Sequence, residues 1–318
     1  MEPTKRIIIV CGPTAVGKTG VALDLAAAAG AQIVGADSMQ IYRYLDIGTA
    51  KPTAEEQARV PHHLVDFCDP AEPFNAAAYS RLARKTVDRL LEKGVVPLVV
   101  GGTGLYIKGL LGGLFPAPPP DRNIRKRLQA EAEQLGTPAL HDRLVQVDPK
   151  TAARLHPNDT FRVVRALEVL EATGEPISRQ QDRHRFEDEP YRTLKIGLFL
   201  QREALYRRID RRCDAMLEAG LIEEVKNLLE RGYSPRLKSM QSIGYRHVVD
   251  YLQGRATFEE TRKLFSRDTR RYAKRQLTWF RSDPEIRWLT PEETDKARSM
   301  IRKFLAGEQI DADPALGG

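Results

Sequence analysis

Short apolar runs alternate with amphipathic stretches in the first hundred residues of the chain. Three runs lie at Ile7–Val10, Gln32–Ala36 and Val96–Val100, each bounded by glycine or another turn residue, and a fourth lies at Leu194–Leu200. The segments between the first three runs have the periodicity of helices. Short apolar runs separated by helices are typical of buried parallel strands in βαβ units. The pattern therefore predicts an α/β fold, with a parallel sheet of the P-loop type flanked by helices.

The middle of the chain predicts a second, mostly helical region. The proline cluster of Leu114–Asn123 cannot form a helix interior or a central strand. Beyond it, helical patterns cover Ile124–Leu135, His141–Val147 and Asp159–Ala172, and the charged stretch Ser178–Arg192 is interpreted as a loop. We predict an inserted helical domain at residues 116–193.

The inserted domain divides the predicted core in the sequence. Residues 1–115 and 194–288 would form the α/β core and its C-terminal helices, and residues 289–318 a C-terminal segment. The end of that segment, Gly307–Gly318, has few apolar residues, and we expect it to be disordered.

Composition limits the class of protein. The chain has 318 residues, a hydrophobic content of 42% and a net charge of +7, which weakly favours an anionic partner. It has no apolar run of about 18 residues, so we expect no contact with a membrane. Its cysteines, Cys11, Cys68 and Cys213, show no metal-binding spacing. Widely spaced cysteines fit reduced thiols, so we expect a cytoplasmic protein.

Positive charge is concentrated in one predicted helix, Thr261–Arg281. It contains eight lysines and arginines and a single acid, Asp268. Phe265, Tyr272 and Trp279 recur every seven residues and predict an apolar seam, while Lys263, Arg267, Arg270 and Lys274 lie on another face. This face is either an ordinary solvated surface or a contact surface for a phosphate backbone.

A glycine-rich loop follows the first predicted strand. It matches the phosphate-binding pattern G-x-x-x-x-G-K-[ST]. In this pattern the backbone N–H groups surround phosphate oxygens, the lysine contacts the outer phosphates and the last hydroxyl binds Mg²⁺. The loop itself does not distinguish ATP from another diphosphate. Its residues are Gly12, Pro13, Thr14, Ala15, Val16, Gly17, Lys18 and Thr19, the last of which is the expected Mg²⁺ ligand.

The expected acidic partner of the loop is in an unusual place. A P-loop ATPase has an acid at the end of a later strand, but here Val96–Val100 ends in Gly101-Gly102-Thr103-Gly104. The carboxylate instead ends the second strand as Asp37, which we expect beside the P-loop at the carboxyl edge of the sheet. This set of groups suits a small-molecule kinase or an enzyme whose leaving group is a diphosphate.

Five motifs occur in order along the chain: GPTAVGKT, GADSMQIYRYLDIGTAKP, VGGTGLYIKGLL, HPNDTFRVVRALEV and QSIGYR. Together they resemble those of one family, the tRNA dimethylallyltransferases or tRNA isopentenyltransferases, over about Ile7 to Trp288. The resemblance implies that the protein transfers a dimethylallyl group from dimethylallyl diphosphate to N6 of the adenine just 3′ of the anticodon. It also implies Mg²⁺ as cofactor and the tRNA anticodon stem-loop as partner. The chain resembles the compact bacterial type, so we expect a monomer without zinc.

The resemblance also implies roles for individual residues. Asp37 falls on the family's proposed catalytic base, and Thr103 and Arg125 on positions at the tRNA and catalytic site. Arg208 and Arg212 fall where the family has arginines that could contact the diphosphate. The implied tRNA-contacting residues are Asp37, Ser38, Met39 and Gln40, then Phe161, Arg162, Val163, Val164 and Arg165, and finally Gln241, Ser242, Ile243, Gly244, Tyr245 and Arg246.

Each of these roles has a structural alternative. Asp37 could cap a helix, Thr103 could support the glycine turn, Arg125 could be solvated, and Tyr245 could pack in the core. Two other functions remain open at this point. A small-molecule kinase would transfer phosphate from ATP, and a non-catalytic RNA-binding protein would bind tRNA without transfer from any donor.

Overall fold

The computed structural model describes residues 5–113, 121–184 and 190–310. Most of the proline cluster and the end of the predicted disordered tail lie outside these residues. The described chain divides into two compact units. Unit 1 comprises Met1–Leu111 and Glu189–Gly318, and unit 2 comprises Gly112–Asp188. Each unit has its own hydrophobic cluster.

Unit 1 is built on a six-stranded sheet in the order β3-β2-β4-β1-β5-β6, and every strand pair is parallel. The prediction of a parallel sheet flanked by helices is confirmed. The central strand β1 pairs with β4 and β5, so β4 separates it from β2. The strands are β1 (Arg6–Cys11), β2 (Ala31–Gly35), β3 (His62–His63), β4 (Val96–Gly101), β5 (Arg192–Leu198) and β6 (Arg287–Leu289).

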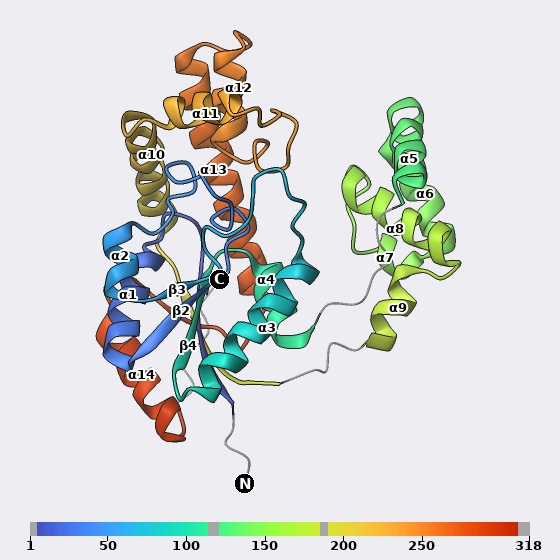
Figure 1. Cartoon of the computed structure of the whole chain (residues 1–318). Coiled ribbons are helices and arrows are strands. Elements are labelled where there is room, and N and C mark those ends of the chain that lie inside the picture. Colours follow the sequence, from blue (N-terminus) through green and yellow to red (C-terminus); the bar gives the residue numbers. More distant parts are fainter. Residues whose placement is uncertain (1–4, 114–120, 185–189, 311–318) are drawn as a thin grey trace. The chain divides into compact units, whose positions relative to one another are not determined.

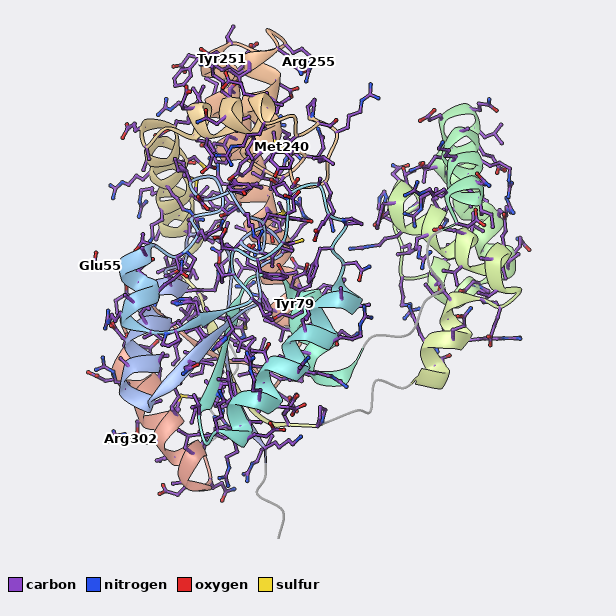
Figure 2. All side chains as sticks on the ribbon, in the orientation of Figure 1. Glu55, Tyr79, Met240, Tyr251, Arg255 and Arg302 are labelled. Carbon is purple, nitrogen blue, oxygen red and sulfur yellow. The ribbon has the colours of Figure 1, made fainter. Side chains whose placement is uncertain are left out.

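Helices cover both faces of this sheet. In Figure 1, α1 and α14 lie on one side of the strands and α3 and α4 on the other. Figure 2 labels Tyr79 of α3 inside this core and Glu55 and Arg302 at its surface. The helices of unit 1 are α1 (Lys18–Ala29), α2 (Ala54–Arg59), α3 (Ala76–Glu92), α4 (Gly104–Gly112), α10 (Arg202–Glu218), α11 (Leu221–Glu230), α12 (Tyr245–Leu252), α13 (Phe258–Arg281) and α14 (Thr294–Ala306).

Unit 2 is entirely helical in its described part. Its small core contains Leu128, Leu140, Leu144 and Leu167, all nearly or fully buried, which join three of its helices. Asp121 and Asp159 cap the first and the fourth helix through their side chains, which explains where these helices begin. The helices are α5 (Arg122–Leu135), α6 (Thr137–Val147), α7 (Pro149–Ala152), α8 (Thr160–Thr173) and α9 (Ile177–His184).

The structure corrects two details of the sequence interpretation. The stretch expected to be a charged loop at Ser178–Arg192 begins as helix α9, which buries Ser178 and Gln180. The C-terminal segment is not separate from the core, because α14 packs on α1 and β5. The short edge strands β3 and β6 had no apolar pattern long enough to predict them.

No helix in the described part of the chain is long and apolar enough to cross a membrane.

Candidate active site

The loop after β1 has the geometry of a phosphate-binding site. Ala15, with φ of 64°, and Gly17, with φ of 104°, lie in the left-handed region, which turns the backbone into a concave arc of N–H groups. Gly17 is also the N-cap of α1, so the positive end of that helix points to the loop. A diphosphate placed here would meet backbone donors and a helix dipole together.

Lys18 is held inside this arc. Its Nζ donates to the carbonyl oxygens of Gly12, at 3.0 Å, and Pro13, at 2.7 Å. Burial lowers the pKa of Lys18 to about 8; the charge of Asp37 raises this pKa and that of Arg212 lowers it further. A bound anion would offset the cost of keeping this ammonium charged.

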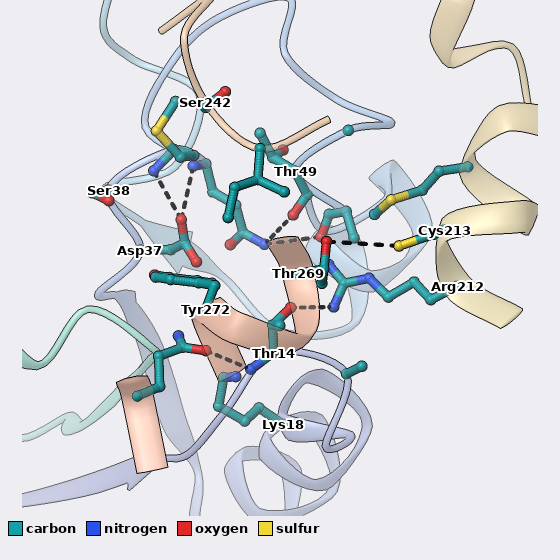
Figure 3. A pocket seen from close by; sticks show the side chains of 18 of the residues that line it. Thr14, Lys18, Asp37, Ser38, Thr49, Arg212, Cys213, Ser242, Thr269 and Tyr272 are labelled. Atoms are coloured by element: carbon teal, nitrogen blue, oxygen red, sulfur yellow. Dashed lines mark hydrogen bonds between the residues drawn. The ribbon is translucent and has the colours of Figure 1, made fainter. Parts of the chain in front are cut away.

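Two arginines of α10 reach the same loop. Arg212 Nη1 donates to Thr14 Oγ1 at 2.9 Å, as Figure 3 shows, and burial lowers the pKa of this guanidinium. Arg208 lies against Gly17, where an added Cβ would be 3.2 Å from its Nη2. Arg208 and Arg212 therefore lie close enough to the loop to contact a diphosphate bound there, and the neighbouring Arg211 lines the same cavity.

Asp37 lies two residues beyond the end of β2 and organises the turn that follows. Its Oδ1 accepts from the backbone N–H of Met39 at 2.8 Å and of Gln40 at 3.3 Å. The capping alternative thus describes part of its role, although the capped segment is a turn and not a helix. The charge of Asp37 also acts on Lys18, Arg212 and Tyr272. Figure 3 shows Asp37 above the ring of Tyr272.

The glycine turn after β4 separates Asp37 from the P-loop. The sequence predicted Asp37 directly beside the P-loop. In the structure β4 lies between β2 and β1, so Asp37 and the P-loop are not direct neighbours. Thr103 Oγ1 accepts from the backbone N–H of Ser38 at 3.1 Å, and the Thr103 backbone N–H donates to Ala36. Thr103 therefore supports the Asp37 turn.

These elements surround one cavity of about 800 Å³. The P-loop, the Asp37 turn, α10 and α13 each contribute part of its wall, and Figure 3 shows labelled side chains from all four. Its apolar lining includes Met39, Met216, Ile243 and Phe265. A cavity with cations at one end, a carboxylate and an apolar wall can hold a substrate that is part anion and part hydrocarbon.

The segment Gln241–Arg246 also lines the cavity, but its members differ in what they can contact. Tyr245 is fully buried, and its hydroxyl donates to Glu224 Oε1 at 2.5 Å. Its side chain therefore packs in the core, and base stacking by Tyr245 is not compatible with this arrangement. Arg246 Nη2 donates to Asp268 Oδ2 at 2.5 Å. Gln241, Ser242 and Ile243 line the cavity directly, and Gly244, with φ of 93°, begins α12.

The other predicted contacts lie in unit 2. Arg125 of α5 donates to the buried Glu168 of α8, with Nη2 at 2.6 Å from Oε2, and Arg165 Nη1 donates to the same oxygen at 3.0 Å. Arg125 is thus paired with a buried carboxylate while its side chain remains partly exposed. Phe161 is 75% exposed and Arg162 is exposed.

Two residues of the same segment cannot contact RNA through their side chains in this arrangement. Val163 and Val164 are buried in the core of unit 2. This distinction could have been predicted. The apolar residues of an amphipathic helix gather on its buried face, so Val163 and Val164 are expected to be buried, unlike Arg162 and Arg165.

The basic helix α13 differs from the prediction on its apolar side. Phe265 is buried, but Trp279 is 42% exposed and Tyr272 faces the cavity, so these three residues do not form one seam. The buried face is instead partly polar, with Thr269 and Gln276. Arg267, Arg270 and Lys274 lie toward the surface, where Arg270 pairs with Asp210 and Arg267 with Asp268.

The sequence interpretation missed Gln276, Tyr272 as a cavity residue, Arg211 and Glu224. The sequence marks these residues only by position. They lie within or next to the two basic segments that contain α10 and α13. Glu224 Oε2 accepts from the backbone N–H groups of Asp46 and Ile47, and so anchors the loop of residues 46–50. Contacts between residues so far apart in the sequence leave no periodic pattern, so the sequence could not predict them.

The donor groups present fit Mg²⁺ bound mainly through a substrate. No group of three or more His, Cys, Asp or Glu side chains that could hold a metal by itself occurs in the described residues. Thr19 and Asp37 both line the cavity. A protein hydroxyl, one carboxylate, phosphate oxygens and water form the kind of hard-oxygen set in which Mg²⁺ is usually bound.

Fold and site together define an α/β protein of the P-loop class with a site for a phosphorylated, partly apolar ligand. Two family models match the chain: IPP transferase over residues 40–283 and isopentenyl transferase over residues 5–67. The chain belongs to the tRNA dimethylallyltransferase family, as the resemblance of its motifs predicted, and it is of the bacterial type.

Relatives of high similarity support this assignment. The tRNA dimethylallyltransferase of Desulfosudis oleivorans is 53% identical over 95% of this chain and 97% of its own length, and that of Geobacter sulfurreducens is 53% identical over 94% and 96%. The full-length tRNA isopentenylpyrophosphate transferase of Bacillus halodurans has a TM-score of 0.70 at 42% identity, covering 95% of this chain and 96% of its own.

A more distant structure resembles this one over nearly the whole chain. It is that of a eukaryotic dimethylallyltransferase acting on tRNA, which has a TM-score of 0.82 at 26% identity and covers 98% of this chain and 82% of its own. These similarities do not favour a small-molecule kinase.

Proposed function

We propose that the protein transfers the dimethylallyl group of dimethylallyl diphosphate to N6 of the adenine immediately 3′ of the anticodon in tRNA, releasing diphosphate. One observation carries this proposal. A single cavity places the cationic P-loop, an apolar wall and the carboxylate of Asp37 together. The family membership supports a prenyl transfer to tRNA.

The diphosphate would lie in the P-loop. The ammonium of Lys18, the guanidinium groups of Arg208 and Arg212 and the N-terminus of α1 would oppose its charge. Negative charge builds on the diphosphate as its bond to the allylic carbon breaks. Fixed cations and dipoles in a partly buried site stabilise this charge strongly. When bound through Thr19 and the diphosphate oxygens, Mg²⁺ would supply further neutralisation of the same charge.

The adenine would approach from the Asp37 side. The base must leave its stack, because the N6 atom cannot reach an allylic carbon inside the anticodon loop otherwise. As the bond between N6 and that carbon forms, the N6 proton would pass to the carboxylate of Asp37. Thr103 would act indirectly, because its hydroxyl holds the backbone of Ser38 next to Asp37.

The RNA itself would be bound by cationic surfaces on both units. In unit 1 these are the exposed side chains of α13 and Arg246. In unit 2 they are Arg125, Arg162 and Arg165, with the exposed ring of Phe161 available for stacking. We further propose that the protein acts as a monomer in the cytoplasm, in keeping with its free cysteines.

Mass analysis of bulk tRNA nucleosides tests this function. Incubating tRNA with the protein, Mg²⁺ and dimethylallyl diphosphate should yield an adenosine that carries one dimethylallyl group in place of one N6 hydrogen. Sequencing of the modified fragment should place it directly 3′ of the anticodon. Transfer of phosphate from ATP to a small acceptor would contradict the proposal, and so would tight tRNA binding without transfer.

A further inference from the structure

Gln276 is a buried amide in the C-terminal part of α13 that joins two loops of the site. Its side-chain Oε1 accepts from the backbone N–H of Thr14 at 2.8 Å, and its Nε2 donates to the carbonyl oxygen of Gly102 at 2.9 Å. The residue is only 5% exposed. Thr14 belongs to the P-loop and Gly102 to the turn after β4, so both ends of one amide are bound to backbone of different loops.

The fit around this amide leaves no free space on the Gly102 side. A Cβ at Gly102 would be 2.2 Å from Gln276 Nε2, and a Cβ at the preceding Gly101 would be 2.1 Å from the carbonyl oxygen of Ala36. The glycine turn is therefore packed tightly between the end of β2 and α13. A movement of either neighbour would move this turn with it.

The hydrogen bonds continue from Gln276 to both sides of the proposed reaction. On one side, Thr14 accepts a hydrogen bond from Arg212 at the P-loop. On the other, Thr103, next to Gly102, accepts from the backbone N–H of Ser38 in the Asp37 turn. The leaving group would lie on the first side and the acceptor amine on the second.

We propose that Gln276 is a positioning residue that sets the distance between the bound diphosphate and Asp37. This inference rests on the proposed transfer reaction. Gln276 needs no contact with either substrate, because it acts through the backbone of two loops. Errors of about 1 Å in the placement of reacting groups can cost a factor of about 10² in rate, so its loss should slow the chemical step more than it weakens binding.

Three variants make this testable. Q276M keeps the length of the side chain and removes both hydrogen bonds. Q276E keeps an acceptor for Thr14 and loses the donor to Gly102 until its carboxyl is protonated, when it again resembles the amide. Q309M, the same kind of change at an exposed glutamine beyond α14, is the matched control. Each variant is compared with the wild type by pyrophosphate affinity, tRNA affinity and single-turnover transfer at saturating substrates.

We expect Q276M to transfer about 10–100-fold more slowly at saturation, with tRNA affinity within about twofold of the wild type. The rate of Q276E relative to the wild type should rise as the pH falls from about 8.5 to about 5.5, since protonation restores the donor. The relative rate of Q276M should stay flat over this range.

Two results would overturn the inference. One is transfer by Q276M within about twofold of the wild type. The other is a slow Q276E whose relative rate does not recover at low pH, which would indicate a general packing defect. A wild-type protein that transfers nothing would instead refute the proposed function, so the two failures are distinguishable.

Discussion

At the scale of single residues, the proposed chemistry depends on a few charged groups that line one cavity. Lys18 is the clearest case. Burial lowers the pKa of its ammonium to about 8 in the free protein, so near neutral pH it is charged and contacts only two backbone carbonyl oxygens. A bound diphosphate would raise this pKa by its negative charge.

Donor binding should therefore depend on pH through Lys18. Below about pH 8 the ammonium is already present, and above it binding must be coupled to uptake of a proton. The affinity for dimethylallyl diphosphate should fall by up to about tenfold per pH unit above pH 8. Titration calorimetry in buffers of different ionisation enthalpy measures both affinity and proton uptake. The Lys18→Ala variant should bind weakly and lose this dependence; proton uptake that persists in it would assign the effect to another group.

The role of Asp37 as a general base leads to a second prediction. Asp37→Asn keeps the acceptor for the Met39 and Gln40 N–H groups but is not a useful base. It should bind both substrates nearly as before and transfer about 10²–10⁴-fold more slowly. Single-turnover rates across a Mg²⁺ series measure this, with Asp295→Asn as an exposed control. Partial rescue by extra Mg²⁺ would point to metal binding, and a rate within a few-fold of the wild type would remove Asp37 from the mechanism.

At the scale of elements, α13 has two faces of different chemistry. Its buried face contacts the P-loop and the glycine turn, and its outer face carries most of the local positive charge. Several outer cations are engaged with acids of the protein, as in the pairs Arg262–Asp214 and Arg270–Asp210. Exposed pairs of this kind contribute little stability, so exchanging an acid for an RNA phosphate costs little.

Replacing Arg267, Arg270 and Lys274 together with alanine should therefore weaken tRNA binding and flatten its salt dependence. Each lost phosphate contact should reduce the slope of log affinity against log salt by about 0.7–0.9. Binding measured between about 50 and 200 mM salt gives this slope. The matched control replaces three exposed cations of α3 and α14, Arg81, Lys85 and Arg302. Equal slopes in both triple variants would mean that α13 presents only a solvated face.

At the scale of the whole molecule, the described residues form two hydrophobic cores that have no residue in common. One surrounds the sheet of unit 1 and the other lies among α5, α6 and α8 of unit 2. All the residues that line the cavity belong to unit 1. A mutation that destabilises unit 2 should therefore leave diphosphate binding nearly unchanged.

Leu128→Ala tests this separation. Leu128 is fully buried in unit 2, and its truncation should destabilise that unit by about 2–5 kcal/mol. Pyrophosphate affinity should stay within about twofold of the wild type, because the P-loop depends on the core of unit 1. Hydrogen exchange of α5–α8 and calorimetry with pyrophosphate measure the two effects. Leu98→Ala, in the sheet core, is the control that should impair both stability and binding. A parallel loss of pyrophosphate affinity in Leu128→Ala would contradict the separation.

The sequence by itself determined the parts of the protein that depend on local patterns. The strand β1, the P-loop and α1 follow from a buried apolar run, two glycines with special backbone angles and a helical repeat. The parallel sheet, the helical middle region and the family motifs follow from the same kind of signal. Lys18 could be singled out from the P-loop pattern and Thr103 from its family motif. Asp37 could be singled out because it follows a predicted strand at the edge where ligands of α/β proteins bind.

Only the tertiary structure decided the relations between these parts. It placed β4 between β1 and β2, which made the glycine turn the spacer between the P-loop and Asp37. It buried Tyr245 against Glu224 and turned Val163 and Val164 into core residues. It also brought Gln276 within hydrogen-bonding distance of Thr14, 262 residues away, and of Gly102, so that one side chain joins two loops. The physical reason is that a strand or helix is specified by neighbours a few residues away, whereas strand order, burial and amide pairing depend on which distant surfaces pack together.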